Sequence, residues 1–271
     1  MSARDPISLV ATDLDETLWI HGVVPLQTRV ALATLTANDV PVLAATARRP
    51  GSTLNSMRTN EIMLPTVLFN GSLGLDFESG DVFHSHVFES HVSLEVLDIL
   101  SSVGIEPCVN IQHPTHDVVV GKAPSTSPRH LAFIAPWLQY GDLRGVAINE
   151  PVLSIGVCGR EHELMLRAQR AVGTLAATTV SRDADFGEFT LSIRPFGVTK
   201  WEGVLAYCRA HGIDDHQVLA VGDGQNDVEL LCMAAVSCAS IGACDEVLAI
   251  ANYRLDDFPD GGWHSIVELI L

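Results

Sequence analysis

The stretch that decides the fold is ISLVATDLDETL, residues 7–18. Residues 7–12 form a short apolar run, which predicts a strand that is buried on both faces. Two carboxylates, Asp13 and Asp15, follow this run directly. Because ligands of open parallel sheets bind at the carboxyl ends of the strands, we expect both acids to lie at a ligand site.

Apolar runs alternate with helical patterns on both sides of the long middle segment. Further buried strands are predicted at Val42–Ala45, Thr66–Phe69, Val218–Val221 and Val236–Ile241. Helices are predicted at Leu26–Asn38, Trp201–His211, Asp227–Ala235 and Trp263–Leu271. Such alternation is typical of a parallel sheet with helices on both faces. We therefore predict an α/β fold with a Rossmann-like, doubly wound parallel sheet as its core.

The middle of the chain has a different pattern. Apolar and polar residues alternate in four segments, residues 82–87, 117–120, 152–157 and 189–193, as expected for a half-exposed antiparallel sheet. Amphipathic helices are expected among them, at residues 94–100, 129–138 and 162–172. The chain is therefore expected to hold an inserted α+β domain, residues 80–194, within a core built from residues 1–79 and 195–271.

Composition limits the classes of partner. The formal net charge of −17 at pH 7 disfavours binding to nucleic acid or to an anionic membrane surface. No long apolar stretch precedes the first charges, and no window approaches the ~18 apolar residues of a membrane span. The six cysteines include no C-x-x-C pair, so we expect a reduced, cytoplasmic protein. The sequence leaves monomer and homodimer open.

Reactive side chains follow three of the predicted strands. Asp13 and Asp15 follow the first strand, Thr46 follows the second, and the loop GDGQND, residues 222–227, follows a late one. The candidate site residues are Asp13, Asp15, Thr46, Ala47, Arg48, Lys200, Asp223, Asn226 and Asp227. This set supplies acids for a metal ion, a hydroxyl donor, a fixed cation and backbone amides. Phosphoryl transfer depends on such groups, because positioning and charge stabilisation do most of its work.

Other metal and cofactor sites fit less well. The loop 222–227 lacks the remaining acids of a calcium loop and the third glycine of a dinucleotide-binding fingerprint. His84 and His86 would share one face of a strand, and His113 and His116 flank a turn, so a zinc site was considered. Polar surface explains these histidines equally well, and we favour it.

Four segments in order resemble the motifs of the haloacid-dehalogenase-like phosphatase superfamily. They are VATDLDETL, AATARR, GVTKWEGV and LAVGDGQNDVELL. FNGSLGLD resembles the Asn-Gly segment that leads into the cap domain of the Cof-type sugar-phosphatase branch, and the C-terminal part resembles the usual ending of that branch. The resemblance covers nearly the whole chain. It implies a Rossmann-like core with an inserted α+β cap that closes over the core and sets substrate specificity.

The resemblance also implies a role for each site residue. Asp13 is the nucleophile, and Asp15 is the general acid that protonates the departing alcohol and then the base that activates water. Mg²⁺ is held by the carboxylates of Asp13 and Asp223 and the backbone carbonyl of Asp15, with Asp227 in support. The expected phosphate-binding residues are Thr46, Ala47, Arg48, Lys200 and Asn226. Taken alone, the sequence is equally compatible with two positions for Arg48 and Arg49. Their side chains could reach an anionic substrate, or they could be exposed to solvent. The expected partner is a small phosphorylated metabolite, and sugar phosphates are the leading substrate class.

Three residues depart from the family pattern. Glu16 replaces a usual glycine and is expected to add negative charge beside the metal, Ala47 replaces another glycine, and Trp201 follows Lys200 where glycine is frequent. Glu16 and Trp201 are expected to reshape the pocket. Two alternatives stay open: a phosphomutase or phosphotransferase, in which an alcohol replaces water as the acceptor, and a catalytically feeble phospho-ligand-binding regulatory protein.

Overall fold

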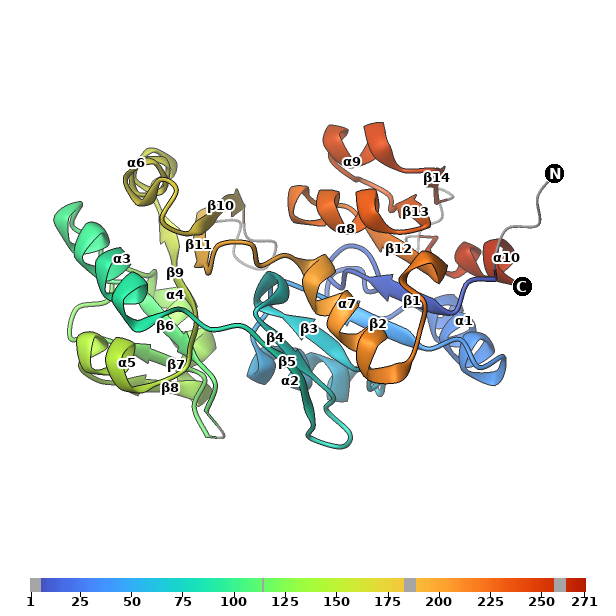
Figure 1. Cartoon of the computed structure of the whole chain (residues 1–271), viewed down its shortest axis with the longest axis horizontal. Helices are drawn as coiled ribbons and strands as arrows, with labels where there is room; N and C mark the ends of the chain where they lie inside the picture. Colours follow the sequence, from blue (N-terminus) through green and yellow to red (C-terminus); the bar gives the residue numbers. More distant parts are fainter. Residues whose placement is uncertain (1–5, 114, 183–188, 256–261) are drawn as a thin grey trace. The chain divides into compact units, whose positions relative to one another are not determined.

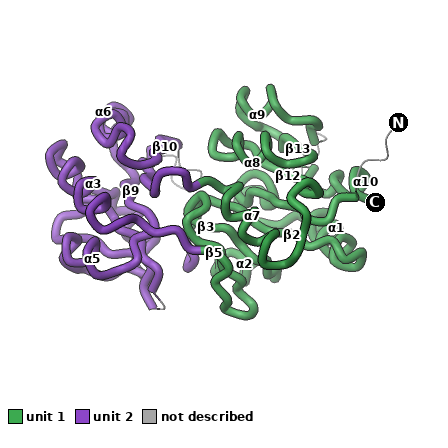
Figure 2. The backbone as a smooth tube through the Cα atoms, in the orientation of Figure 1, with its two compact units in different colours: residues 1–48, 53–84, 199–271 green, residues 49–52, 85–198 purple. Residues whose placement is uncertain are grey.

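The computed structural model describes residues 6–113, 115–182, 189–255 and 262–271 (Figure 1). The chain divides into two compact units (Figure 2). Unit 1 comprises residues 1–48, 53–84 and 199–271, and unit 2 comprises residues 49–52 and 85–198. The domain boundaries expected after residues 79 and 194 stay a prediction. None of the described helices is long and apolar enough to span a membrane.

Unit 1 is built on an eight-stranded sheet with the strand order β14-β13-β12-β1-β2-β3-β4-β5. Its strands are β1 (Leu9–Thr12), β2 (Val42–Ala45), β3 (Thr66–Leu68), β4 (Leu73–Leu75), β5 (Val82–Ser85), β12 (Val218–Gly222), β13 (Val236–Ala239) and β14 (Tyr253–Arg254). From β14 to β3 every neighbouring pair is parallel, and β4 is antiparallel to β3. This is the predicted doubly wound parallel sheet.

Both faces of this sheet are covered, which is why its central strands are buried along their whole length and apolar at most positions. On β1, Val10 belongs to one buried cluster, which also contains residues of helix α1. Leu9 and Ala11 belong to a second cluster, which contains residues of helices α7, α8 and α9. The helices of unit 1 are α1 (Leu26–Ala37), α2 (Pro50–Thr59, whose first residues belong to unit 2), α7 (Lys200–His211), α8 (Val228–Met233), α9 (Asp245–Ile250) and α10 (Val267–Ile270). Short 3-10 turns occur at Phe69–Gly71, Asp215–Gln217, Gln225–Asp227 and Trp263–Ile266.

The position of one strand was predicted wrongly. Residues 82–87 were assigned to the inserted sheet, but β5 adds to β4 at the edge of the unit 1 sheet. An edge strand of the core is half exposed too, so its apolar–polar alternation could not distinguish the two sheets. The strand ends at Ser85, so His84 and His86 do not share a face of one strand.

Unit 2 contains a six-stranded sheet with the order β10-β11-β9-β6-β7-β8. Its strands are β6 (Cys108–Ile111), β7 (Val118–Val120), β8 (Leu138–Tyr140), β9 (Val152–Arg160), β10 (Ala177–Arg182) and β11 (Phe189–Arg194). All neighbouring pairs are antiparallel except β7 and β8, which are parallel. Unit 2 is therefore the α+β part of the fold.

Four helices accompany the unit 2 sheet: α3 (Ser90–Ser102), α4 (Pro128–Ile134), α5 (Leu143–Asn149) and α6 (His162–Val172). A 3-10 turn, Ala135–Trp137, follows α4. Helices α3, α5 and α6 contribute to the main buried cluster, and α4 contributes to a smaller one with Cys108, Val118 and Val120. The helix expected at residues 129–138 ends at Ile134, because Pro136 cannot donate the backbone hydrogen bond that would continue it.

Candidate active site

Three of the predicted site carboxylates meet at the carboxyl edge of the unit 1 sheet. Asp13 follows β1, and Asp223 and Asp227 follow β12, its neighbour in the sheet. A carboxylate oxygen of each lies within 4.8 Å of the others. Asp13 is 6% exposed and Asp227 is fully buried. Parallel pairing of β1 with β12 therefore brings together acids that are 210 residues apart in the chain.

Lys200 provides the positive charge within this group. It is the first residue of α7, whose N-cap Thr199 accepts a hydrogen bond from the Glu202 amide. Its Nζ donates to Oδ1 of Asp13 and to Oδ1 of Asp227, at 2.6 Å each. Burial alone would lower the pKa of Lys200, but Asp13 and Asp227 outweigh burial and raise this pKa above its usual range. The two acids therefore favour the charged form of Lys200 although its side chain is fully buried.

The acids outnumber this one cation. Burial, assisted by the neighbouring carboxylates and opposed by Lys200, raises the pKa of Asp13 well above its usual value. Burial and Asp227 likewise raise the pKa of Asp223 to about 6. A divalent cation would offset the excess negative charge, and a hard ion such as Mg²⁺ prefers oxygen ligands of this kind. The residues of the cluster fit such an ion.

Asp227 organises the loop after β12. Its Oδ2 accepts hydrogen bonds from the backbone amides of Asp223 and Gly224, at 3.2 and 3.0 Å. A Cβ on Gly222 would lie 2.6 Å from the Asp227 side chain, so this close approach requires glycine. Both Asp227 oxygens thus have protein donors, and the supporting role expected for this acid at a metal stays a prediction.

Asp15 lies apart from the three-carboxylate group, with 29% of its side chain exposed. Arg48 donates to both of its oxygens, from Nε to Oδ2 at 2.7 Å and from Nη2 to Oδ1 at 2.5 Å. The indole Nε1 of Trp19 donates to Oδ1 at 3.1 Å. The structure therefore places the Arg48 guanidinium on the predicted acid, and a phosphate-binding role for Arg48 stays a prediction.

The remaining phosphate-binding candidates follow β2, as Thr46 and Ala47 do, or β12, as Asn226 does. Thr46 is buried, and its hydroxyl accepts a hydrogen bond from the Arg48 amide at 3.2 Å. Ala47 is exposed between them. Asn226 donates from Nδ2 to Oδ1 of Asn70 at 3.0 Å. Their contact with a phosphate stays a prediction.

Sequence reasoning missed Asn70 and Trp19 as site residues. Asn70 is buried and has a left-handed backbone, φ 54°, as does the preceding Phe69, φ 51°. The Asn-Gly pair after the third strand was a usable signal, because these two residues tolerate that conformation best. Trp19 had no comparable signal, since a tryptophan after a strand usually fills the core.

Glu16 and Trp201 were expected to reshape the pocket, and that effect stays a prediction. Glu16 has φ 53°, and its carboxylate accepts hydrogen bonds from the backbone amide and Nδ1 of His21, at 3.1 and 3.2 Å. The Glu16 carboxylate is thus hydrogen-bonded to His21 and does not belong to the three-carboxylate group. Trp201 is 4% exposed and belongs to the buried cluster that includes Val67 and Val204.

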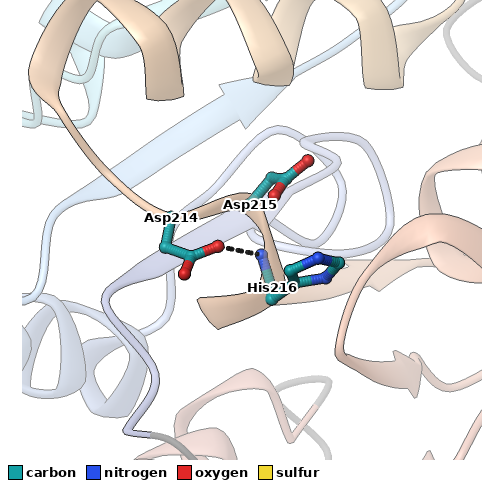
Figure 3. A group of neighbouring side chains, drawn as sticks. All are labelled: Asp214, Asp215 and His216. Carbon is teal, nitrogen blue, oxygen red and sulfur yellow. Dashed lines mark hydrogen bonds between the residues drawn. The ribbon is translucent and has the colours of Figure 1, made fainter.

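A second acidic group lies in the turn before β12, formed by Asp214, Asp215 and His216 (Figure 3). Asp214 accepts a hydrogen bond from the His216 amide at 3.0 Å and thereby caps the 3-10 turn Asp215–Gln217. This capping hydrogen bond explains why the three side chains lie close together, without a metal ion. In unit 2, the rings of His113 and His116 lie 3.8 Å apart between centroids, and within the described part of the chain they have no third metal-binding neighbour.

Comparison with known proteins identifies the family. The family model of haloacid dehalogenase-like hydrolases matches residues 10–263, so the chain belongs to this family, as its motifs predicted. Over 68 residues it is 38% identical to a phosphoglycolate phosphatase of Methanopyrus kandleri. Over 75 residues it is 36% identical to a 5-amino-6-(5-phospho-D-ribitylamino)uracil phosphatase of Escherichia coli. These matches cover 25% and 28% of this chain, and only 29% and 28% of the respective relatives.

Similarity to solved structures extends over both units. A sugar phosphatase of HAD subclass IIB has a TM-score of 0.75, with 19% sequence identity, and the match covers 97% of this chain and 98% of that one. At this identity the comparison establishes the fold. The predicted Rossmann-like core with an inserted α+β part is thereby confirmed.

Proposed function

We propose that this protein is a Mg²⁺-dependent phosphatase that hydrolyses small phosphomonoesters through a covalent aspartyl-phosphate on Asp13. One observation carries the proposal. Asp13 is a buried carboxylate that a lysine holds at 2.6 Å, and two further carboxylates lie within 4.8 Å of it. A carboxylate nucleophile needs this arrangement, because a nearby cation must reduce its repulsion from the phosphate.

In the proposed reaction, an oxygen of Asp13 attacks phosphorus. Lys200 keeps Asp13 and Asp227 in place through its two hydrogen bonds. Asp13, Asp223 and the backbone carbonyl of Asp15 would hold Mg²⁺, which supplies positive charge to the transferring phosphoryl group. Asp15 gives its proton to the leaving oxygen as the P–O bond breaks. It then takes a proton from the water that cleaves the aspartyl-phosphate, so the enzyme returns to its starting state.

The substrate class is proposed from the family relatives. Proteins similar to this chain are named for phosphoglycolate, for a phosphorylated ribitylamino-uracil and for sugar phosphates. All three are small phosphomonoesters with an alkyl leaving group. We propose a substrate of this kind, with sugar phosphates first, and a cytoplasmic location.

The direct test is phosphate release from p-nitrophenyl phosphate and a panel of sugar phosphates, with Mg²⁺ or with EDTA. Wild type should turn over only with the metal, and Asp13→Asn should abolish turnover. Asp215→Asn is the control, because this half-buried acid belongs to the group before β12 and not to the three-carboxylate group. Wild-type activity no higher than that of Asp13→Asn would refute the proposal. Adding a second sugar and analysing the products would identify a phosphotransferase instead.

A further inference from the structure

We propose that Trp19, together with Arg48, is a positioning residue that holds Asp15 where it exchanges a proton with the leaving oxygen. The inference rests on the proposed function and adds to it Trp19, which lies outside the motifs quoted above. Trp19, Arg48 and Asp15 are hereafter called the Asp15 cradle.

The cradle directs three donors to one carboxylate. Arg48 occupies both oxygens of Asp15, and the Trp19 indole shares Oδ1 with it. The guanidinium carbon of Arg48 also lies 5.5 Å from the centroid of the Trp19 ring, within the range of a cation–π contact. Trp19 therefore contacts both other members of the cradle and limits the rotation of each.

The local backbone explains why Trp19 can do this. The amide of Trp19 donates to the carbonyl oxygen of Leu14 at 3.0 Å, which closes a tight turn around Asp15. Trp19 is fully buried in unit 1, whereas 29% of the Asp15 side chain is exposed. A rigid buried ring thus fixes an acid that faces a more open region.

The chemistry of the reaction gives this positioning a consequence. When Asp13 bonds to phosphorus, the ester P–O bond breaks and its electron pair stays on the leaving oxygen. The proton of Asp15 moves to that oxygen, and the hydrogen bonds from Arg48 and Trp19 fix where the Asp15 carboxyl group lies. In the second half, water attacks phosphorus, its proton moves to Asp15, and the bond between Asp13 and phosphorus breaks.

A simple core-filling role for Trp19 is the competing explanation, and the leaving group distinguishes the two. p-Nitrophenolate departs without a proton, whereas the alkoxide of glycerol 2-phosphate requires one. A defect in Asp15 positioning therefore reduces kcat/KM for the alkyl ester and spares the aryl ester, because kcat/KM reports the steps through departure of the leaving group. Damage to the fold reduces both alike.

The experiment compares wild type, Trp19→Phe and Trp263→Phe on both esters with Mg²⁺ present. Trp263 is a matched control, since it is also fully buried in unit 1 and its indole donates to the Thr12 hydroxyl at 2.9 Å. We expect Trp19→Phe to lower kcat/KM for glycerol 2-phosphate by about tenfold, part of the roughly 10²–10⁴-fold that a general acid contributes. The value for p-nitrophenyl phosphate should change by less than about twofold, and Trp263→Phe should affect both esters equally.

Equal losses on both esters in Trp19→Phe, or no loss on either, would overturn the inference. Arg48→Met provides a second, independent variant on the other side of the cradle, and it decides the matter if Trp19→Phe does not fold. A selective loss on glycerol 2-phosphate supports the cradle, and an equal loss overturns it. Wild type inactive on both esters would instead refute the proposed function, so the two failures are distinguishable.

Discussion

Replacing the buried lysine tests the centre of the site most directly. Lys200 forms ion pairs with Asp13 and Asp227, and its side chain is fully buried. In Lys200→Met, two buried carboxylates would lose their shared cation. Removing one partner of a buried ion pair costs about 3–5 kcal/mol, since the remaining charge is left uncompensated. We expect a loss of this size in the free energy of unfolding, a large part of the roughly 5–15 kcal/mol of a typical protein.

The chain contains a natural control for this substitution. Its two lysines are Lys122 and Lys200, and Lys122 is exposed. Lys122→Met should change the free energy of unfolding by no more than about 0.5 kcal/mol, as surface substitutions usually do. Urea denaturation in EDTA measures both variants without any contribution from a bound metal ion. Similar losses in the two variants would refute the argument that the buried cation holds the acids together.

A double-mutant cycle identifies the partner. Asp13→Asn removes one of the two charges that face Lys200, so the double variant should be more stable than the sum of the single losses predicts. Residues in direct contact show coupling of about 0.5–3 kcal/mol, and we expect a value in the upper half of this range. Strict additivity would mean that the contact of 2.6 Å between Lys200 and Asp13 contributes nothing to folding.

Three further predictions concern the surroundings of the site. Glu16→Gly should leave phosphatase activity within about twofold of wild type, because the Glu16 carboxylate binds His21 and glycine readily adopts its φ of 53°; a tenfold gain would show that this charge does act on the metal. Mg²⁺ at 100 times its dissociation constant should stabilise wild type by about 2.7 kcal/mol, as followed by thermal unfolding, and Asp223→Asn should remove most of this gain. Reductive methylation of the folded protein should modify Lys122 and spare the fully buried Lys200, whereas labelling in urea should modify both; modification of Lys200 in the folded state, detected by peptide mass spectrometry, would contradict its burial.

Much of the core could be predicted because its determinants are local. The runs at β1, β2 and β12 are apolar at nearly every position, as strands between two helical layers must be. Parallel strands end at a common edge, and the acids that follow β1 and β12 meet there because these two strands are neighbours in the sheet. Edge strands such as β5 and β8 have a neighbouring strand on one side only, and their patterns do not need to be apolar on both faces. For β5, the pattern fits either sheet.

Side-chain partners could be predicted less well than strands. Arg48 has four rotatable bonds and could reach a phosphate or a carboxylate, and only the folded backbone selects Asp15. Glu16 illustrates a different limit. Its left-handed φ is the reason that glycine suits this position, and the same φ turns its side chain toward His21. The sequence predicts an added charge at this position, and only the folded backbone determines which partner that charge meets.

The arrangement of charges explains how so acidic a chain can accept an anionic substrate. Asp13, Asp223 and Asp227 with Lys200 carry two formal negative charges in excess, and the net charge of the whole chain is −17. Arg48 cannot correct this excess while both oxygens of Asp15 occupy its guanidinium. Lys200 likewise forms ion pairs with two carboxylates, those of Asp13 and Asp227. The described Arg48 and Lys200 groups therefore bind the acids. In the proposed function, a bound divalent cation would supply the charge that attracts a phosphate. It follows that removing the metal should weaken substrate binding as well as slow the chemical step. A chelator that lowered kcat and left substrate affinity unchanged, measured by calorimetry on Asp15→Asn, which keeps the carboxylates of Asp13 and Asp223, would contradict this division of roles.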